Sequence, residues 1–212
     1  MIKKKTLTTS LLAAICLLIL VTGCDQRRSA SLKDYTVTCA LDGKLHHDSA
    51  TLLVLEEDYN KLRVCGTART HDSVFTFKGQ IDRPRVALIR WDNDSAAPFH
   101  FVLEAGDIHL SIKPESWIVS GSAQNSEYQH FLHQRKAIMD ARVSTWQEYL
   151  NASSHSSLKR EDEARLVKQD SLLNDSLQRI TIERINRGDA VGRIIRERFA
   201  GQLDQEHARQ LK

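Results

Sequence analysis

The feature that most constrains the fold is a change of hydrophobic period near residue 125. Between residues 35 and 122, apolar and polar residues alternate in about eight short runs. From residue 126 to residue 212, apolar residues recur every three or four positions, and this segment contains no proline. The first period is typical of strands and the second of helices. The sequence therefore predicts an α+β chain in which strands and helices are segregated.

The predicted strands are short and are separated by turn residues. In the run 35–41, Val37, Cys39 and Leu41 share one face. Starts spaced by roughly 8–12 residues are typical of an antiparallel β-sandwich or barrel. We expect such a module of about eight strands over residues 34–125. The remaining predicted strands cover residues 51–56, 62–65, 74–80, 85–91, 99–104, 108–113 and 117–119.

Residues 126–212 are predicted to form a helical extension. Its first helix would be capped at residues 125–127, and a polar linker at 151–157 would precede a second helix. Gly188-Asp189 indicates a stop and a restart, and a short helix is expected at 204–211. The apolar positions of the first helix are expected on one face: Tyr128, Phe131, Leu132, Ile138, Met139, Val143, Trp146, Tyr149 and Leu150.

Residues 1–23 predict a secretory signal peptide. Three lysines at positions 3–5 precede an apolar run at 11–20, which is about half of the roughly 20 residues needed to span a bilayer. The following string, Val21-Thr22-Gly23-Cys24, resembles the lipobox of bacterial lipoproteins. That resemblance implies cleavage before Cys24 and attachment of a diacylglyceryl group to its thiol. Residues 24–33 would then be a polar tether.

The lipid predicts where the protein works. Several buried acyl chains, at about 0.8 kcal/mol per CH₂, give stable anchoring, so we expect a membrane-anchored protein of the bacterial cell envelope. Asp25 favours inner-membrane retention in some bacteria, and Arg27-Arg28 does not resemble the acidic tags of surface-exported lipoproteins. We therefore expect a periplasm-facing domain, with the inner and the outer membrane both open.

Charge excludes one class of partner. The formal net charge is +3 at pH 7, but the predicted signal peptide carries three lysines and no acidic residue. The mature chain from Cys24 to Lys212, 189 residues long, is therefore formally neutral. A neutral chain gives no reason to expect nucleic acid as a partner.

Two cysteines, Cys39 and Cys65, remain after removal of the signal peptide and lipidation of Cys24. Both lie in predicted strands of an oxidising compartment, so a disulfide between them and two buried free thiols both stay open. The sequence contains no Cys-x-x-Cys, which argues against a thioredoxin-type redox site.

Other candidate chemistry is weak, and we predict no catalytic residue, no metal site and no cofactor. The His130-x-x-His133 pair lacks a third ligand at suitable spacing. His46-His47 lies in a turn, and Asp92-Asn93-Asp94 lacks the glycine and distal glutamate of a calcium loop. Ser120-Gly121-Ser122 lacks the Gly-x-Ser-x-Gly frame of a nucleophile elbow.

Three strings resemble a β-rich module, a domain of unknown function, found at the N-terminus of periplasmic lipoproteins with a thioredoxin-like (AhpC/TSA-type) domain. They are Phe75–Gly79 followed by Pro84, then Phe101–Asp107, then Ser120–Asn125. Phe75 and Phe77 would share a face, and Gly79 would permit a bulge or turn. The family's thioredoxin-like domain would begin about where Lys212 ends the sequence. Its redox activity is therefore not transferred, and no catalytic residue maps onto this chain.

Two functional hypotheses follow. The first is a non-enzymatic accessory lipoprotein whose C-terminal helices contact a protein partner or a second copy. The alternative is a truncated or split N-terminal part of a thiol–disulfide oxidoreductase lipoprotein. A ligand-binding module for peptides or glycans is a third, weaker idea, because the only aromatic platform in view is Trp91 with Trp117.

Overall fold

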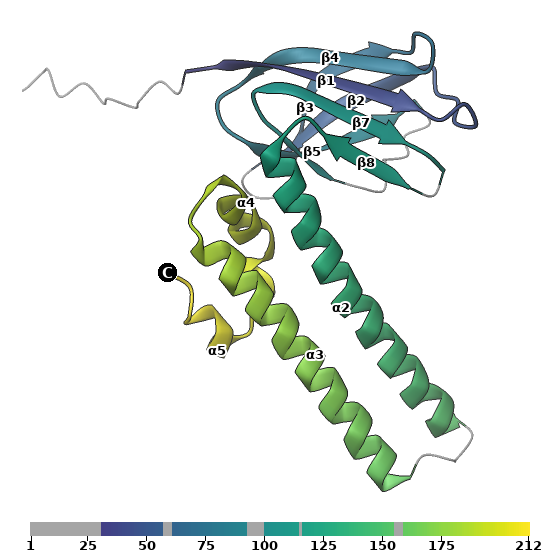
Figure 1. Ribbon diagram of the computed structural model, residues 1–212, viewed down its shortest axis with the longest axis vertical. Coiled ribbons are helices and arrows are strands. Elements are labelled where there is room, and N and C mark those ends of the chain that lie inside the picture. The colour runs from purple at the N-terminus through teal and green to yellow at the C-terminus, as the bar shows by residue number, and fades with distance from the viewer. Residues whose placement is uncertain (1–30, 57–60, 93–99, 115, 155–158) are drawn as a thin grey trace, which may run out of the picture. The chain divides into compact units, whose positions relative to one another are not determined.

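The computed structural model describes residues 31–212, with gaps at 57–60, 93–99, 115 and 155–158. The predicted signal peptide and the predicted lipidation site, Cys24, lie outside the described residues. Leu32–Lys212 forms one compact unit. Within it, strands come first and helices second, as the change of period predicts (Figure 1).

Eight strands form two four-stranded sheets, with orders β4-β1-β7-β8 and β3-β2-β5-β6. We call residues 33–120 the β module. The strands are β1 (Lys33–Leu41), β2 (Ser49–Leu55), β3 (Leu62–Arg69), β4 (Val74–Ile81), β5 (Arg85–Trp91), β6 (Phe101–Leu103), β7 (Gly106–Ile112) and β8 (Trp117–Ser120).

Both sheets contribute to one apolar core. In β1 every second residue is buried, from Tyr35 to Leu41, and Phe75 and Phe77 of β4 are buried beside them. The predicted alternation in β1 and the shared face of the two phenylalanines are therefore confirmed. Strand β5 is buried almost throughout because both of its faces are covered: Ile89 enters this core, whereas Val86 packs against helices.

One strand pair departs from the antiparallel arrangement expected. β1 pairs with β7 in parallel, with Tyr35 beside Gly106 and Leu41 beside Ile112. The other pairs are antiparallel. A parallel neighbour requires a long crossover, and strands β2 to β6 supply it here. Local alternation cannot reveal such a pairing, because it is the same for both directions.

Gly79 also differs from its expected role. The β1–β4 register continues through Tyr35↔Gly79 without a bulge. A Cβ at position 79 would lie 2.6 Å from the hydroxyl oxygen of Tyr35. The glycine thus provides room for an aromatic ring on the neighbouring strand.

The helices follow directly and begin earlier than expected. The first, α2, starts at Ala123 because Ser122, and not Asn125, accepts the hydrogen bond from the third helical N–H. The predicted stop at Gly188 and restart at Asp189 are confirmed: Gly188 has φ +69°, and Asp189 caps α4. The helices are α2 (Ala123–Ser154), α3 (Arg160–Asn186), α4 (Ala190–Phe199), η1 (Ala200–Gln202) and α5 (Gln205–Ala208).

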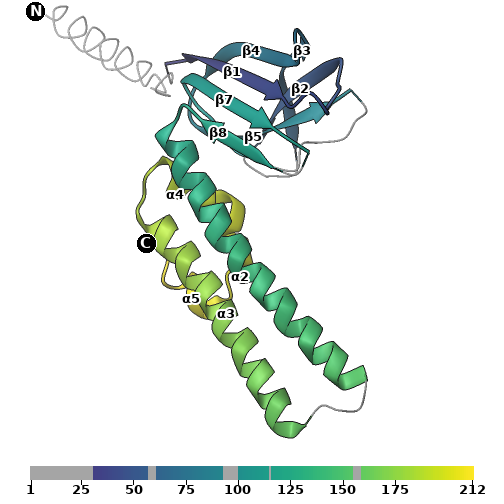
Figure 2. The same cartoon turned by 45° about the vertical axis from the view of Figure 1, so that its right-hand side comes forward.

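A second apolar core joins the helices to the outer face of β5 and β6. Val86 and Val102 meet Phe131 from α2, Ile185 from α3 and Ile195 from α4. Beyond this core, α2 and α3 lie side by side and extend away from the sheets (Figure 1, Figure 2). None of the helices in the described part combines the length and the apolar composition that a membrane crossing requires.

Candidate functional site

The junction between β6 and α2 is built by a buried asparagine. Asn125 is fully buried; its side-chain Oδ1 accepts from the Val102 N–H at 2.7 Å, and its Nδ2 donates to the Val102 carbonyl at 2.8 Å. β6 is an edge strand, and the Asn125 amide satisfies the N–H and the carbonyl of Val102 that a neighbouring strand would otherwise bind.

Ser122 and Glu104 complete this junction. The Ser122 hydroxyl accepts from the Asn125 N–H at 3.1 Å and donates to the Glu104 carboxylate. Burial raises the pKa of Glu104. Gly121 precedes the cap with φ +91°, and a Cβ there would lie 2.3 Å from the Asp107 carbonyl oxygen. The second and third strings of the family resemblance are therefore in contact, and their role here is to fix the first helix on the β module.

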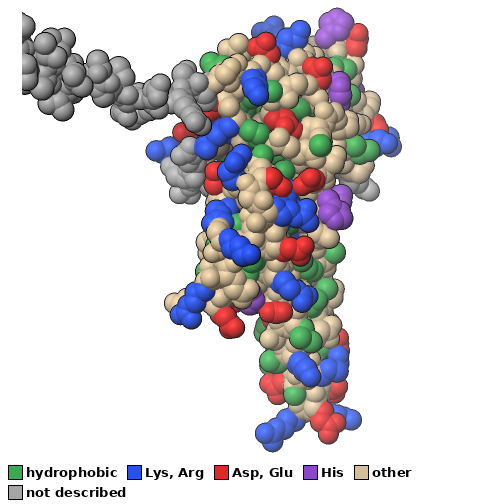
Figure 3. Space-filling view, turned by 60° about the vertical axis from the view of Figure 1, so that its left-hand side comes forward, with side chains coloured by type: hydrophobic (Ala, Val, Ile, Leu, Met, Phe, Trp, Pro, Cys, Tyr) green, Lys and Arg blue, Asp and Glu red, His purple; other side chains and the backbone are tan. Residues whose placement is uncertain are grey.

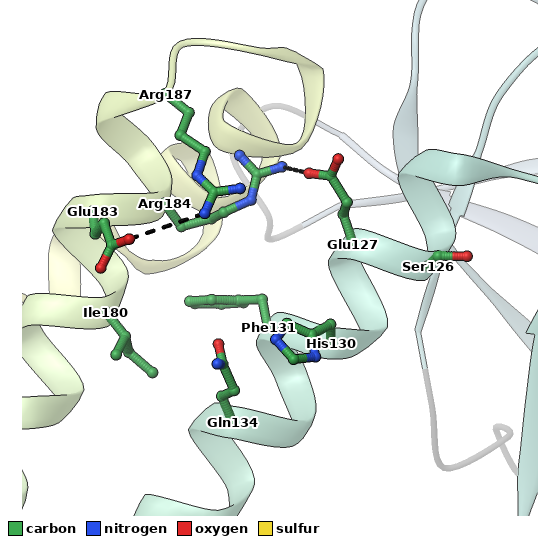
Figure 4. Close-up of a pocket in the computed structure, with 9 residues that line it drawn as sticks. All are labelled: Ser126, Glu127, His130, Phe131, Gln134, Ile180, Glu183, Arg184 and Arg187. Atoms are coloured by element: carbon green, nitrogen blue, oxygen red, sulfur yellow. Dashed lines mark hydrogen bonds and ion pairs between the residues drawn. The ribbon is translucent and has the colours of Figure 1, made fainter.

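A cavity of about 350 Å³ lies between the first turns of α2 and the last turns of α3. Figure 4 shows Arg184 reaching from α3 toward Glu127 on α2. The Arg184 side chain is only 7% exposed; it donates to Glu127 at 2.5 Å and to both oxygens of Asp189 at 2.8 and 3.0 Å. The lining residues are Ser126, Glu127, His130, Phe131, Gln134, Ile180, Glu183, Arg184 and Arg187.

The charges of this cavity compensate one another. Arg184 is neutralised by two carboxylates, and Arg187 lies 3.9 Å from Glu183. Asp189 also accepts from the Gly192 N–H at 2.8 Å. Burial opposes ionisation of Asp189, but hydrogen bonds from Arg184 and Gly192 outweigh it and lower its pKa. Arg184 therefore holds α2, α3 and the start of α4 together, which is a structural role.

Two other half-buried arginines, Arg135 and Arg198, lie near Phe199. The Cζ atoms of Arg135 and Arg198 are 4.4 and 5.1 Å from the ring centroid. Arg198 also donates to the Tyr128 hydroxyl and to Nδ1 of His100. Burial and Arg198 lower the pKa of His100 to about 4, so at neutral pH the imidazole is uncharged and accepts through Nδ1. This group fastens α4 to α2 and β6.

The histidines considered as metal ligands have other partners. His130 lines the cavity around Arg184. The ring of His133 packs edge-on with Trp117, with 6.2 Å between the ring centroids. His47 stacks on Trp91 at 4.6 Å and contacts Asp92. No group of three metal-ligating side chains occurs in the part of the chain that the structure describes. Residues 93 and 94 of the calcium-like string lie outside it.

The two remaining cysteines are free thiols in the structure. Cys39 is fully buried in the core, and burial raises its pKa to about 12. Cys65 is half-buried on β3, and burial raises its pKa as well. Neither thiol has the lowered pKa of a redox nucleophile. The Cys39–Cys65 disulfide stays a prediction.

The aromatic platform considered for ligands is not an open surface. Trp91 is only 8% exposed and belongs to the apolar core of the β module, and Trp117 packs against that core. Exposed apolar side chains gather instead on the helices. Six of the ten large hydrophobic residues that are exposed in the described chain lie far from the β module along α2 and α3: Met139, Val143, Trp146, Leu150, Val167 and Leu172. Figure 3 shows hydrophobic side chains among charged ones on one face of these helices.

Sequence reasoning missed Arg184 and the pairing role of Asn125. The sequence does contain a signal for Asn125. It is a polar residue one helical turn before Tyr128 on the apolar face, and such a residue is a candidate for a buried hydrogen bond. Arg184 offered no such signal, because a cation near the end of a helix is usually solvated.

Comparison with known proteins supports the modular reading. No curated protein matches the sequence. Residues 35–128 match the family model described as Domain of unknown function (DUF4369). The matched region runs from β1 to the first turns of α2 and therefore includes the Asn125 junction. The match supports an uncharacterised module on the N-terminal side of the helices.

Proposed function

We propose that this protein is a lipid-anchored accessory protein of the bacterial cell envelope, facing the periplasm. The support is the order of a basic start, an apolar run and the lipobox-like string that ends at Cys24. The β module is then a β-sandwich that stands next to the membrane through a short polar tether. A formally neutral mature chain fits this role, because it needs no charged polymer as a partner.

The role proposed is binding and not catalysis. The cavity between α2 and α3 is internally neutralised around Arg184, and Cys39 is held as a thiol by its high pKa. The observation that carries the binding role is the exposed apolar surface of α2 beyond the β module. Val143, Trp146 and Leu150 are 51%, 46% and 60% exposed on the same helix. Apolar clusters of this kind mark contact surfaces for proteins.

The anchor is tested by metabolic labelling with radioactive palmitate. Wild type and Cys16→Ala should carry the label and sediment with membranes, because Cys16 leaves with the signal peptide. Cys24→Ala should lose the label and leave the membrane fraction. Label that persists in Cys24→Ala would refute the lipid attachment.

The contact surface is tested by recovering the tagged protein from detergent extracts. Val143→Asp places a charge on the apolar surface and should release whatever the wild type retains, whether another protein or a second copy. Leu172→Asp, at a position that is 59% exposed, is the matched control for the added charge. Absence of any reproducible partner or self-association in the wild type would contradict the proposal.

The second candidate is a part of a thiol–disulfide system, supported by the matched module and by its resemblance to the N-terminal module of thioredoxin-like lipoproteins. In that case the redox cysteines belong to another polypeptide or domain. The discriminating observation is the DNA directly downstream. A thioredoxin-like reading frame there supports this candidate, and an unrelated gene removes most of its weight.

A further inference from the structure

The half of the α2–α3 pair that lies away from the β module lacks a third layer. We call residues 139–154 of α2 and 160–174 of α3 the distal arm. Of the buried residues in these two helices, only Thr145 and Leu166 fall in it. A helix normally buries a wide apolar stripe against neighbouring elements. The distal arm instead leaves most of its large apolar side chains uncovered, and it therefore has the composition of a partly assembled bundle.

The apolar residues of α2 in this arm follow the spacing of a coiled-coil seam. Met139, Val143, Trp146 and Leu150 are separated by four, three and four residues, and their exposure runs from 39% to 60%. We call these four residues the stripe. Alternating steps of three and four place side chains in one line along a helix, where a second helix can pack. Val167 of α3 lies beside Trp146 and widens the stripe.

We propose that the stripe binds a second copy of this chain, with the two α2 helices antiparallel about a two-fold axis between Val143 and Trp146. The spacing four, three, four reads the same from either end. A second copy running in the opposite direction therefore sets Met139 opposite the partner's Leu150 and Val143 opposite the partner's Trp146. Each copy offers the same patch to the other, as a two-fold interface requires.

Charge favours the antiparallel copy over a parallel one. Lys136 continues the stripe by one further step toward the N-terminus. In a parallel pair this lysine would face its own copy. The two ammonium groups would then repel, with each partly compensated by Asp140 of its own helix at 2.6 Å. In the antiparallel pair Lys136 lies opposite the partner's Ser153. The flanking charges, Asp140 and Arg142, then come beside the partner's Gln147 and the partner's Tyr149, so no like charges meet.

The β module does not obstruct this pairing. In the antiparallel register the partner's Ser154, the last residue of its α2, lies level with Arg135. Twelve residues separate Arg135 from the start of α2 at Ala123, which is about 18 Å at 1.5 Å per residue. The partner's α2 therefore ends before it reaches the sheets. This inference rests on the contact surface of the proposed function and names its occupant.

The test is cross-linking by position, with full chains extracted in mild detergent and a short bis-maleimide reagent. One tagged chain carries Met139→Cys and a differently tagged chain carries Leu150→Cys. The mixture should form a cross-linked heterodimer. Met139→Cys alone should not, because its two copies stand eleven residues apart, about 16 Å along the helix axis. Wild type is the blank for Cys39 and Cys65, and Leu172→Cys is the control for random collisions.

Each outcome decides the proposal. Heterodimer formation that falls about tenfold with Val143→Asp, but not with Leu172→Asp, supports the antiparallel copy. Cross-linking of Met139→Cys to itself, without the mixed product, shows a parallel pair and overturns the proposal. No cross-link at any stripe position also overturns it. In that last case, a different protein released from the tagged chain by Val143→Asp would leave the proposed function standing.

Discussion

The α2–α3 pair is covered at one end and open at the other. Near the β module, Phe131 and Ile185 are buried in the core that also holds Val86 and Ile195. In the distal arm the helices are joined mostly by polar contacts: Arg142 binds Asp170 at 2.8 and 3.1 Å and Asn174 at 3.1 Å, and Arg165 binds Glu148 at 2.6 Å. The two halves are equally helical but are stabilised by different interactions.

This difference shows that helix formation and helix burial are separate properties of a sequence. All 32 residues of α2 are helical, in the covered half and in the open half alike. Burial, however, depends on what the rest of the chain brings to each turn. The β module, α4 and α5 cover mainly the proximal half. Of the distal arm, only its inner end at Met139, Arg142 and Asn174 shares a pocket with Phe199 and Leu203. The outer part of the arm is therefore the natural place for an external contact. The following substitutions test this contrast, from the largest expected effect to the smallest.

Phe131→Ala should cause the largest loss of stability. Phe131 is 2% exposed, and its ring centroid lies 5.6 Å from that of Phe199. Removing a buried phenylalanine leaves a cavity and costs about 3–5 kcal/mol. Val143→Ala, at a position that is 51% exposed, should change the free energy of unfolding by no more than about 0.5 kcal/mol in the monomer. Urea denaturation followed by circular dichroism measures both. Similar costs for the two variants would mean that the two halves do not differ.

Asn125→Ala should follow, with a loss of about 2–3 kcal/mol. It leaves the N–H and the carbonyl of Val102 buried without their partner on an edge strand. Asn125→Asp keeps the acceptor but loses the donor and buries a charge, so it should cost at least as much. Gln147→Ala, on the exposed face of the same helix, is the control. A near-neutral Asn125→Ala would show that water replaces the amide.

Asp189→Ala should cost about 1–2 kcal/mol, because it removes the cap of α4. Its carboxylate accepts from the Gly192 N–H and from Arg184. Asp189→Asn keeps an oxygen for the cap and loses only the charge, so it should be the milder variant. Thermal denaturation at neutral pH ranks the two. If both variants cost the same, the ion pair with Arg184 matters more than the cap.

Much of the β module could be predicted from the sequence, because alternation is a local signal. Val37, Cys39, Phe75 and Phe77 predict the buried faces of β1 and β4, and all four residues are in the core. The parallel β1–β7 pair could not be predicted in this way, because the direction of pairing depends on contacts between residues that are about 70 positions apart. The stop at Gly188 was predicted for a local reason as well, since the turn needs a left-handed residue followed by a cap.

The candidate site was less predictable, and α2 shows why. Its apolar positions from Tyr128 to Leu150 are predicted to share one face, but only those near the β module are buried. Phe131 is buried, whereas Trp146 and Leu150 remain exposed. The periodicity describes the helix but not the elements that cover it. The contact surface therefore becomes visible only once the fold shows where the covering elements stop.

The smallest effect is expected in the distal arm, at the pair Arg142–Asp170. The hydrogen bond from Arg142 lowers the pKa of Asp170 below its usual value near 3.9. The stabilisation is therefore complete above that value and is lost as pH falls through the folded-state pKa. Because the pair is partly exposed, it contributes less than about 1 kcal/mol. Asp170→Asn should be slightly less stable than wild type at pH 6, and the difference should disappear near pH 2. Hydrogen exchange of the distal amides measures it. A difference that is unchanged at acid pH would mean that the carboxylate acts there as a neutral acceptor, and that the arm needs no charge to hold its two helices together.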